Sequence, residues 1–405
     1  MHRGLTLFLL PLVILSVLVA GGTARGEQTP SCTIFVQPGK SIQAAINEAP
    51  PGAVICLPAG EWREHLTIGK SLTLRGERGA IVYGYENEVP VIRVYNPTEG
   101  EVVVVLEKLG LTTSATWLTS GIVVEAGVQA AIVGCQIVGS WSGIWVQGSA
   151  QASIDGCEIY ACDTSGILLT ASAQASIADC VFRAELGDDI ALKDSAQATI
   201  VSCTLLNSRA GVWATNSAQV TIDDCAISES DMGIWAWASS QIRITRCAIS
   251  GNDYGISLLD SARVTLTGGN ITGSRMTGIL LQDSCIATIA DCTISENGLS
   301  GVDLWDSSQA TIDGCDISRN EIGCRIRDSS QVRIIGCTVR ENRCYGVTVA
   351  EGPCAFGLPF NGHVIGGGNV IPGWGEEQRN ERAAVCPYDL RFLMTEAGGE
   401  FDRRE

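Results

Sequence analysis

The residues of this sequence best suited to chemistry are its 17 cysteines, because most of them recur at one place in a repeated phrase. In "DSSQATIDGCDIS" (306–318) and "NSAQVTIDDCAIS" (216–228) the cysteine stands at the same position. Nine cysteines share it, and with Gly269 at the one substituted place the spacing is always 22 or 23 residues: Cys135, Cys157, Cys180, Cys203, Cys225, Cys247, Cys292, Cys315 and Cys337. Such a row could bind a soft metal or act as nucleophiles, but both roles need thiolates, which are costly in a dry core. We interpret the row as inward packing, since cysteine packs like a small hydrophobic residue.

The remaining cysteines fall outside that row and are candidates for disulfides if the chain is exported. Cys32 and Cys56 flank a short predicted helix, and we predict that they form a bridge. Cys354 and Cys386 could join the C-terminal segment in the same way, and Cys324 and Cys344 form a weaker third pair. Cys162 and Cys285 have no evident partner in the sequence.

Acidic residues also recur in step with the cysteines, and stacked carboxylates could hold Ca²⁺. The row consists of Asp194, Asn216, Asp260, Asp283, Asp306 and Asp328. Asp and Asn also cap backbone N–H groups in turns. Because the row follows the repeat so regularly, we favour the capping role and predict no cofactor.

Tryptophans provide the clearest sign of a binding surface. By alternation, five of them point outward: Trp145, Trp213, Trp235, Trp237 and Trp305. Exposed indoles in a row usually mark an interaction site, and the flat face of a sugar stacks on indole. A terminal loop or a partner subunit could instead cover this face.

A second candidate site lies next to Trp305, where the following repeat carries Arg325 and Arg327 beside Asp303. Arginine binds carboxylates through two parallel hydrogen bonds, so this group could bind uronic acids. Asp303 could equally form a cross-strand ion pair with Arg325. The sequence leaves both interpretations open.

The elements that position these residues follow from the repeat, which reads approximately "GIxLxDSxQATIxxCxISxNxx". Each unit contains three short stretches that alternate apolar and polar residues, which is typical of half-buried strands. Three strands per unit predict an all-β fold: a right-handed parallel β-helix of about eleven to twelve coils of 22–23 residues, with one coil per repeat. A leucine-rich repeat has an overlapping period, but its LxxLxLxxN framework is missing.

The two ends of the chain differ from the repeats. Residues 1–25 have the basic start, apolar run and small residues of a signal peptide. Residues 26–88 form the N-terminal cap and first coils, and a helix within 41–52 should cover the first coil. The regular repeats occupy residues 89–345, and 346–405 form an irregular C-terminal cap and tail. We therefore expect a protein that is secreted, periplasmic or attached to the cell surface.

Charge and histidine content exclude several functions. The formal net charge is −17, which disfavours nucleic acid and anionic membranes as partners. We expect no membrane association after the signal peptide is removed. Past that segment, His65 and His363 are the only histidines, so a Ser-His-Asp triad or a histidine-built metal site on the coils is excluded.

The segment from Phe35 to Gly76, "FVQPGKSIQAAINEAPPGAVICLPAGEWREHLTIGKSLTLRG", resembles the entry of right-handed β-helix proteins of the pectin-lyase-like superfamily. The resemblance extends to about Asn369 and includes NosD-like proteins and carbohydrate-binding or sugar-hydrolase β-helices. It implies the fold, but this superfamily contains many functions. The scarcity of histidine weakens the copper role that NosD-like proteins imply.

Enzymatic signatures of that superfamily are mostly missing. The segment "GDDIALKD" (187–194) is similar to the Gly-Asp-Asp strand of polygalacturonases, but no histidine follows one repeat later. Asp189 stands where other repeats have glycine, so we interpret the similarity as chance.

These observations favour a protein that binds polysaccharide or another cell-envelope glycan along the tryptophan-bearing strands. The alternatives are a polysaccharide lyase or glycoside hydrolase acting on an acidic glycan near Asp303, Trp305, Arg325 and Arg327, and a structural or adhesive envelope protein without catalysis.

Overall fold

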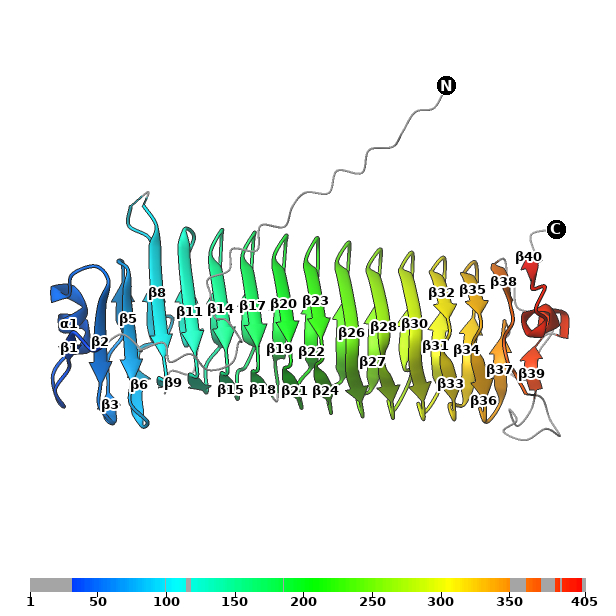
Figure 1. Ribbon diagram of the computed structural model, residues 1–405, viewed down its shortest axis with the longest axis horizontal. Helices are drawn as coiled ribbons and strands as arrows, with labels where there is room; N and C mark the ends of the chain where they lie inside the picture. Colours follow the sequence, from blue (N-terminus) through cyan, green and yellow to red (C-terminus); the bar gives the residue numbers. More distant parts are fainter. Residues whose placement is uncertain are drawn as a thin grey trace, which may run out of the picture. The chain divides into compact units, whose positions relative to one another are not determined.

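The chain winds into a solenoid of parallel strands (Figure 1). The computed structural model describes residues 31–98, 100–113, 118–184, 186–349, 362–372, 383–386 and 388–402. Their coils number about 13 and carry almost no helix, so the predicted right-handed parallel β-helix is confirmed. The count slightly exceeds the eleven to twelve predicted coils, because strands also form before and after the regular repeat.

Each regular coil contributes three strands, which we number by their order in the repeat. The first strands form a sheet of 14 strands, and the second and third strands, together with β1 (Ile34–Phe35) and β40 (Gly399–Asp402) at the two ends, form a sheet of 26. The first strands are β4 (Leu66–Ile68), β7 (Ile92–Val94), β10 (Ile122–Val124), β13 (Ser142–Val146), β16 (Ser165–Leu169), β19 (Asp188–Leu192), β22 (Ala210–Ala214), β25 (Met232–Ala236), β27 (Tyr254–Leu258), β29 (Ile279–Leu281), β31 (Ser300–Leu304), β34 (Ile322–Ile326), β37 (Tyr345–Thr348) and β39 (Ala383–Cys386).

The 26-stranded sheet runs around the rest of each coil. Its second strands are β2 (Ala53–Leu57), β5 (Leu72–Gly76), β8 (Val102–Glu107), β11 (Val128–Val133), β14 (Gln151–Asp155), β17 (Gln174–Ala178), β20 (Gln197–Val201), β23 (Gln219–Asp223), β26 (Gln241–Ser250), β28 (Arg263–Thr272), β30 (Ile286–Ser295), β32 (Gln309–Asp313), β35 (Gln331–Ile335) and β38 (His363–Gly367). Its third strands are β3 (Gly60–Trp62), β6 (Ala80–Gly84), β9 (Gly110–Thr113), β12 (Gln136–Val138), β15 (Glu158–Tyr160), β18 (Val181–Arg183), β21 (Thr204–Leu206), β24 (Ala226–Ser228), β33 (Asp316–Ser318) and β36 (Thr338–Arg340). Strands β26, β28 and β30 continue through both positions.

Single residues in the left-handed conformation turn the chain from one strand to the next. In the coil that contains β31, β32 and β33, these residues are Asp306, Gly314 and Arg319, with φ angles of 58°, 60° and 57°. Glycine, asparagine and aspartate adopt this conformation most readily, and they recur at the first two bends. The bends therefore explain why turn residues repeat with the same period as the strands.

Apolar side chains fill the interior in columns, because equivalent residues of successive coils pair directly. Ile144 pairs with Ile167, and Ile167 with Ile190, and all three are fully buried. The position directly before this column is glycine in most coils, because there is no space for a Cβ atom. A Cβ atom on Gly301 would lie 2.7 Å from the carbonyl oxygen of Gly323 in the next coil. This contact explains the repeated glycine of the sequence.

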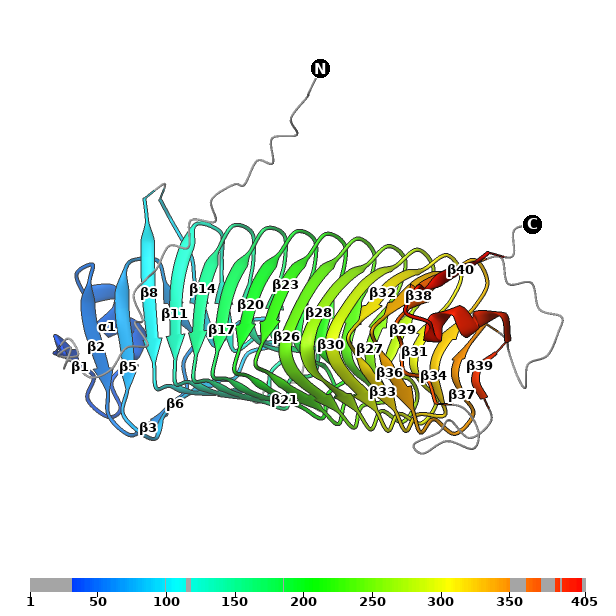
Figure 2. The same cartoon turned by 45° about the vertical axis from the view of Figure 1, so that its right-hand side comes forward.

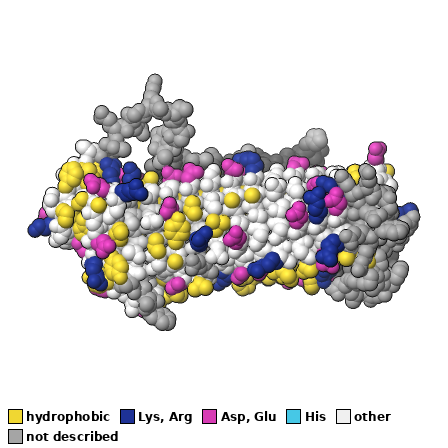
Figure 3. Space-filling view, turned by 90° about the horizontal axis from the view of Figure 1, so that it is seen from below, with side chains coloured by type: hydrophobic (Ala, Val, Ile, Leu, Met, Phe, Trp, Pro, Cys, Tyr) yellow, Lys and Arg dark blue, Asp and Glu magenta, His cyan; other side chains and the backbone are white. Residues whose placement is uncertain are grey.

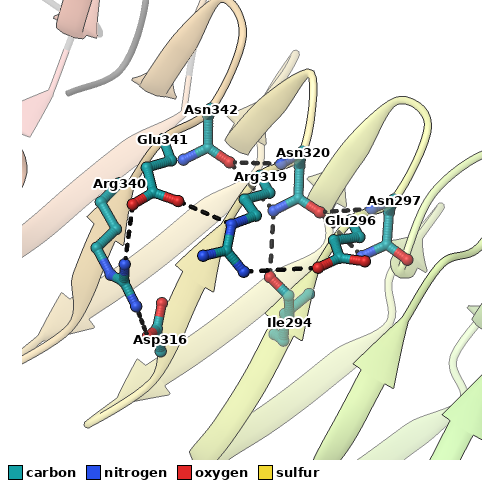
Figure 4. Close-up of polar contacts among 9 residues, drawn as sticks. All are labelled: Ile294, Glu296, Asn297, Asp316, Arg319, Asn320, Arg340, Glu341 and Asn342. Atoms are coloured by element: carbon teal, nitrogen blue, oxygen red, sulfur yellow. Dashed lines mark hydrogen bonds and ion pairs between the residues drawn. The ribbon is translucent and has the colours of Figure 1, made fainter. Parts of the chain in front are cut away.

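Buried asparagines form a hydrogen-bonded ladder at the bend between the third strand and the next first strand (Figure 4). Asn297 Nδ2 donates to Asn320 Oδ1 at 2.9 Å, and Asn320 Nδ2 donates to Asn342 Oδ1 at 3.1 Å. Asn320 Nδ2 also donates to the carbonyl oxygen of Ile294. The ladder thus satisfies polar backbone groups that the bends would otherwise leave buried without partners.

Both ends of the described solenoid are covered. At the N-terminal end, α1 (Ile42–Glu48) begins at the capping residue Ser41 and buries Ile42 and Ile46, as predicted. The predicted bridge between Cys32 and Cys56 is present, and it ties β1 (Ile34–Phe35) to β2. Near the C-terminus, β40 (Gly399–Asp402) pairs antiparallel with β38, and a 3₁₀ helix, η1 (Tyr388–Met394), precedes it (Figure 2). The edge strands are therefore protected from pairing with other chains.

Two other cysteine predictions have different outcomes. Cys324 and Cys344 both carry thiols, so the predicted third bridge is wrong. Cys324 is a fully buried core residue of β34. Cys344 belongs to the next coil and lies at the bend directly before β37. The predicted bridge between Cys354 and Cys386 lies outside the described side chains, as the predicted signal peptide lies outside the described residues.

Charges of both signs are mixed on one long side of the molecule. Figure 3 shows one long side, on which acidic and basic side chains are scattered among hydrophobic and uncharged ones. Among the described residues, no helix is both long enough and apolar enough to span a bilayer.

Candidate functional site

The outward side chains of the 14-stranded sheet form a row along the solenoid, which we call the outer row. Its members pair from coil to coil in the order Val123, Trp145, Leu168, Ala191, Trp213, Trp235, Ser257, Leu280, Asp303 and Arg325. The middle of the row is apolar and aromatic, whereas its C-terminal part is charged. Adjacent members are about 4.8 Å apart.

Two tryptophans of the outer row stack on each other. The ring centroids of Trp213 and Trp235 are 5.8 Å apart, and their planes are inclined by 28°. Trp237 follows the strand of Trp235 and is 44% exposed. The next residue in the row is Ser257, whose small side chain places no ring on the second face of Trp235. Trp237 therefore offers an exposed ring to a ligand, whereas Trp235 is half-buried.

Two cationic side chains lie close to the ring of Trp213. Lys193 Nζ is 5.0 Å from the Trp213 ring centroid, and Arg209 Cζ is 5.5 Å from it. Neither residue stands out in the sequence, because only the register of successive coils places Lys193 and Arg209 next to Trp213. Cations over an indole face are attracted by its quadrupole, so they hold the Trp213 ring in place.

Arg209 is itself fixed by the buried carboxylate of Asp188. Arg209 Nε donates to Asp188 Oδ1 at 2.9 Å, and Arg209 Nη2 donates to Oδ2 at 2.6 Å. The Asp188 side chain is fully buried and that of Arg209 is 47% exposed. Burial raises the pKa of Asp188 although Arg209 opposes this shift, and the hydrogen bonds to Asp188 raise the pKa of Arg209. Asp188 and Arg209 thus form a fixed ion pair, and the carboxylate of Asp188 is not exposed to solvent.

Asp189, the neighbouring residue, replaces the repeat glycine and points into the polar ladder. Its Oδ1 accepts from the backbone N–H of Ala184, and its Oδ2 accepts from the Ser208 hydroxyl, each at 3.1 Å. Ser208 in turn contacts Ser230 Oγ at 2.9 Å. Burial raises the pKa of Asp189 well above its ordinary value. The similarity to polygalacturonases therefore has a structural explanation, since Asp189 extends the ladder instead of facing solvent.

Trp145 and Trp305 stand apart from the stacked pair. Trp145 lies three coils before Trp213, and its Nε1 donates to Thr170 Oγ1 at 3.0 Å. Trp305 lies beyond the C-terminal end of β31, and Arg327 Cζ is 3.8 Å from its ring centroid. The five predicted tryptophans are thus spread over one side of the molecule rather than gathered at one point.

Asp303, predicted to point outward, is only 4% exposed. Its carboxylate faces Arg327 Nε at 3.3 Å and Arg325 Nη1 at 3.8 Å. Burial raises the pKa of Asp303, and the two arginines oppose the shift. The arrangement fits the ion-pair interpretation of this group, while binding of uronic acids by Arg325 and Arg327 stays a prediction.

The row of acidic residues at the first bend caps backbone groups, as favoured from the sequence. Asp283 Oδ2 accepts from the backbone N–H of Asp260 at 3.1 Å, and Asp306 Oδ2 accepts from that of Asp283 at 3.2 Å. Asp328 repeats the contact with Asp306. One oxygen of each of these carboxylates thus accepts a hydrogen bond from the backbone of the neighbouring coil. Within the described part of the chain, no group of three or more His, Cys, Asp or Glu side chains is arranged to hold a metal ion.

The repeated cysteines lie inside the solenoid, as predicted, and donate hydrogen bonds to backbone carbonyls. Cys180 Sγ donates to the carbonyl of Ala178 at 3.1 Å, and Cys203 Sγ donates to that of Val201 at 3.3 Å. The hydrogen bond to the preceding cysteine and burial raise the pKa of Cys203 to about 12. Burial raises the pKa of Cys162, outside the row, to about 11. At neutral pH Cys203 and Cys162 are therefore thiols.

Comparison with known proteins gives a family and a fold. The model of the family described as "Periplasmic copper-binding protein (NosD)" matches residues 64–205 and 178–345. No curated protein matches the sequence.

Three solved structures are similar to this chain, and the first two share its fold. Tailspike protein 3 of bacteriophage CBA120 is 12% identical, with a TM-score of 0.57, over 86% of this chain and 64% of its own length. Vag8 in its complex with C1 inhibitor is 13% identical, with a TM-score of 0.58, over 75% of this chain and 79% of its own. The catalytic domain of a GH87 α-1,3-glucanase is 12% identical, with a TM-score of 0.49, over 86% and 70%. The chain thus spans less than two thirds of the tailspike.

The copper named by the family description does not fit the described residues. Copper prefers imidazole, thiolate or thioether ligands. Of the two histidines in the described coils and caps, His65 uses Nδ1 toward the Pro90 carbonyl, and its Nε2 accepts from the backbone N–H groups of Tyr85 and Glu86. The cysteines of the row are buried, and their thiols are already hydrogen-bonded to backbone carbonyls, as Cys203 is to Val201. We therefore assign no role to copper here.

Proposed function

The chain belongs to the NosD family of periplasmic copper-binding proteins, and we propose that it is an exported β-helix that binds glycans along its outer row. The observation that carries this proposal is the aromatic group of Trp235 and Trp237 beside the stacked Trp213. A sugar ring can stack on the exposed ring of Trp237, and the half-buried Trp235 offers the rest of the aromatic surface. The family description supports a location in the periplasm or outside the cell.

Binding is favoured over catalysis because the carboxylates near this face already have partners. A general acid or base must reach the substrate within hydrogen-bond distance. Asp188 is fully buried against Arg209, Asp189 is buried in the ladder, and Asp303 is buried against two arginines. None of these three offers an exposed carboxylate to a bound sugar.

The proposal is tested by glycan-array binding and by tryptophan fluorescence with the wild-type protein and the double variant Trp235→Ala/Trp237→Ala. Trp141→Ala serves as the control, because Trp141 is exposed to 37% but lies at a bend outside the outer row. We expect glycans to quench the wild-type fluorescence and the double variant to lose at least about tenfold in affinity, as two stacking contacts are removed. Unchanged binding by the double variant would refute the proposal, as would the absence of any glycan ligand. Release of reducing ends or unsaturated uronides would show catalysis instead.

A further inference from the structure

A second regular surface lies on the other sheet, on the outward positions of four consecutive second strands. Strands β14, β17, β20 and β23 lie side by side in successive coils (Figure 1). Each presents a glutamine and, two residues later, a serine or threonine. We call these eight residues the amide–hydroxyl array: Gln151, Ser153, Gln174, Ser176, Gln197, Thr199, Gln219 and Thr221.

The array is a lattice, because its members are in register. Gln151 pairs with Gln174, Gln174 with Gln197, and Gln197 with Gln219. The hydroxyl residues pair in the same order. Neighbouring coils are about 4.8 Å apart, and residues two apart on a strand are separated by about 6.6 Å. Amides and hydroxyls therefore repeat at fixed distances along the solenoid.

The polar groups of the array are available to a ligand. The four glutamines are exposed, as are Ser176 and Thr199. Side-chain hydrogen bonds join the buried Asn297, Asn320 and Asn342, but none joins an array side chain to another residue in the described part of the chain. Glutamine ladders can bond along their own axis. This ladder does not, so its donors and acceptors are left for solvent or a partner.

The array is uncharged on a protein whose net charge is −17. The simplest structural reason would be that like charges opposite each other destabilise a sheet, which favours neutral rows. However, the same two columns carry Arg243, Arg263 and Arg333 in later coils, so the fold accepts charge there. The next outward position of β14 and of β23 carries Asp155 and Asp223, so neutrality is a property of the eight array residues and not of the column or of the whole coils.

We propose that the amide–hydroxyl array binds an extended, uncharged polysaccharide chain that lies parallel to the solenoid axis. An extended pyranose chain advances by about one coil spacing per sugar, so each sugar meets one amide and one hydroxyl. The amide donates and accepts at once, which suits the paired hydroxyls of a neutral sugar. A neutral chain also avoids repulsion by the acidic protein. This surface is separate from the outer row and does not depend on it.

The test uses the full chain and sedimentation with microcrystalline cellulose and chitin, with a soluble neutral β-glucan as competitor. The array variant is Gln174→Ala/Gln197→Ala/Gln219→Ala. The control is Gln309→Ala/Gln331→Ala, in the same column but outside the array. We expect the array variant to bind about tenfold more weakly or worse, because hydrogen bonds to three consecutive sugars are lost. The control and Trp235→Ala/Trp237→Ala should bind like the wild type.

Circular dichroism and the urea midpoint establish that the array variant is folded; if it is not, Gln197→Glu alone replaces it and should weaken binding through one misplaced charge. The proposal is overturned if the wild type is retained by no neutral polysaccharide, or if the array and control variants lose binding equally. It is also overturned if the array variant affects only the inhibition of ice recrystallisation, since the lattice would then match ice and not sugar. Loss of binding in the tryptophan variant alone would support the outer row and contradict the array.

Discussion

The indole rings of Trp213 and Trp235 stack across adjacent coils, with their centroids 5.8 Å apart. The two residues are 22 positions apart in the sequence and meet because parallel pairing without any shift places them opposite each other. The backbones of the two coils fix the positions of the two rings. The stacking geometry therefore depends on the register between the coils. The same register brings Lys193 and Arg209 to Trp213.

The stacked pair should give an exciton-coupled signal in circular dichroism. We expect Trp213→Phe to remove that signal, because the coupling needs two indole rings and phenylalanine supplies only a benzene ring beside Trp235. Trp145→Phe is the matched control, because Trp145 has no aromatic partner among the described residues and pairs with Leu168. An unchanged spectrum in Trp213→Phe would show that the rings do not stack in solution.

The asparagine ladder should contribute to stability out of proportion to its size. Asn320→Ala removes a side chain that bonds Asn297, Asn342 and the carbonyl of Ile294. We expect a loss of about 1–3 kcal/mol in the free energy of unfolding, because buried groups are left unpaired. Asn320→Ser should lose less, since Ser230 and Ser274 occupy the same row in other coils. Equal stability of wild type and Asn320→Ala in urea would contradict this account.

Asp189 should make the stability of the protein depend on pH. Its folded pKa is raised by burial, so the folded state keeps a proton that the unfolded chain has already released. The free energy of unfolding therefore falls as pH rises from the unfolded pKa of about 3.9 through the raised folded pKa. Asp189→Asn keeps the shape without the titration. We expect its advantage over the wild type to grow across that pH window and then to level off, as measured by urea denaturation from pH 3 upward.

The acidic row should need no calcium. Asp306 adopts a φ of 58°, and its carboxylate accepts from the backbone N–H of Asp283. Asp306→Gly keeps the bend and loses the cap, whereas Asp306→Ala loses the cap and adds about 1–2 kcal/mol for a left-handed alanine. We expect the order of midpoints to be wild type, then Gly, then Ala, with no shift on adding Ca²⁺ or EDTA. A calcium-dependent midpoint that disappears in Asp306→Gly would show a metal site instead.

The cysteine row should be inert while the protein is folded. Its cysteines are buried, and hydrogen bonds to the preceding cysteine together with burial raise the pKa of Cys203 and of Cys225 to about 12. We expect Ellman's reagent to react with the nine cysteines of the row slowly in the native protein and fully after unfolding, whereas the partly exposed Cys344 can react before unfolding. A Cu(I) chelator should retain the copper in competition with the folded chain. Copper bound by the wild type and lost in Cys203→Ser would reverse our conclusion about the family's metal.

The sequence alone determined the repeating part of this protein. The period of 22 or 23 residues, the alternation within each strand and the turn residues between strands all follow from local rules, because each coil repeats one set of bends. The buried cysteine row was predictable for the same reason. The helix after Ser41 and the bridge between Cys32 and Cys56 lie outside the repeats, and they were predictable from the residues of that short segment. Whether the predicted tryptophans bind a ligand stays a prediction.

Only the tertiary structure decided which side chains meet between coils and which carboxylates remain open. Asp303 alternates outward in the sequence, yet Arg325 and Arg327 close over it from the next coil. Asp189 looked like a replaced glycine, and it supplies an oxygen to the polar ladder. Cys324 and Cys344 appeared to be neighbours and are not bridged. Each outcome depends on contacts between residues more than 18 positions apart. The period of the repeat shows which positions are neighbours, but it does not show which contacts their side chains form.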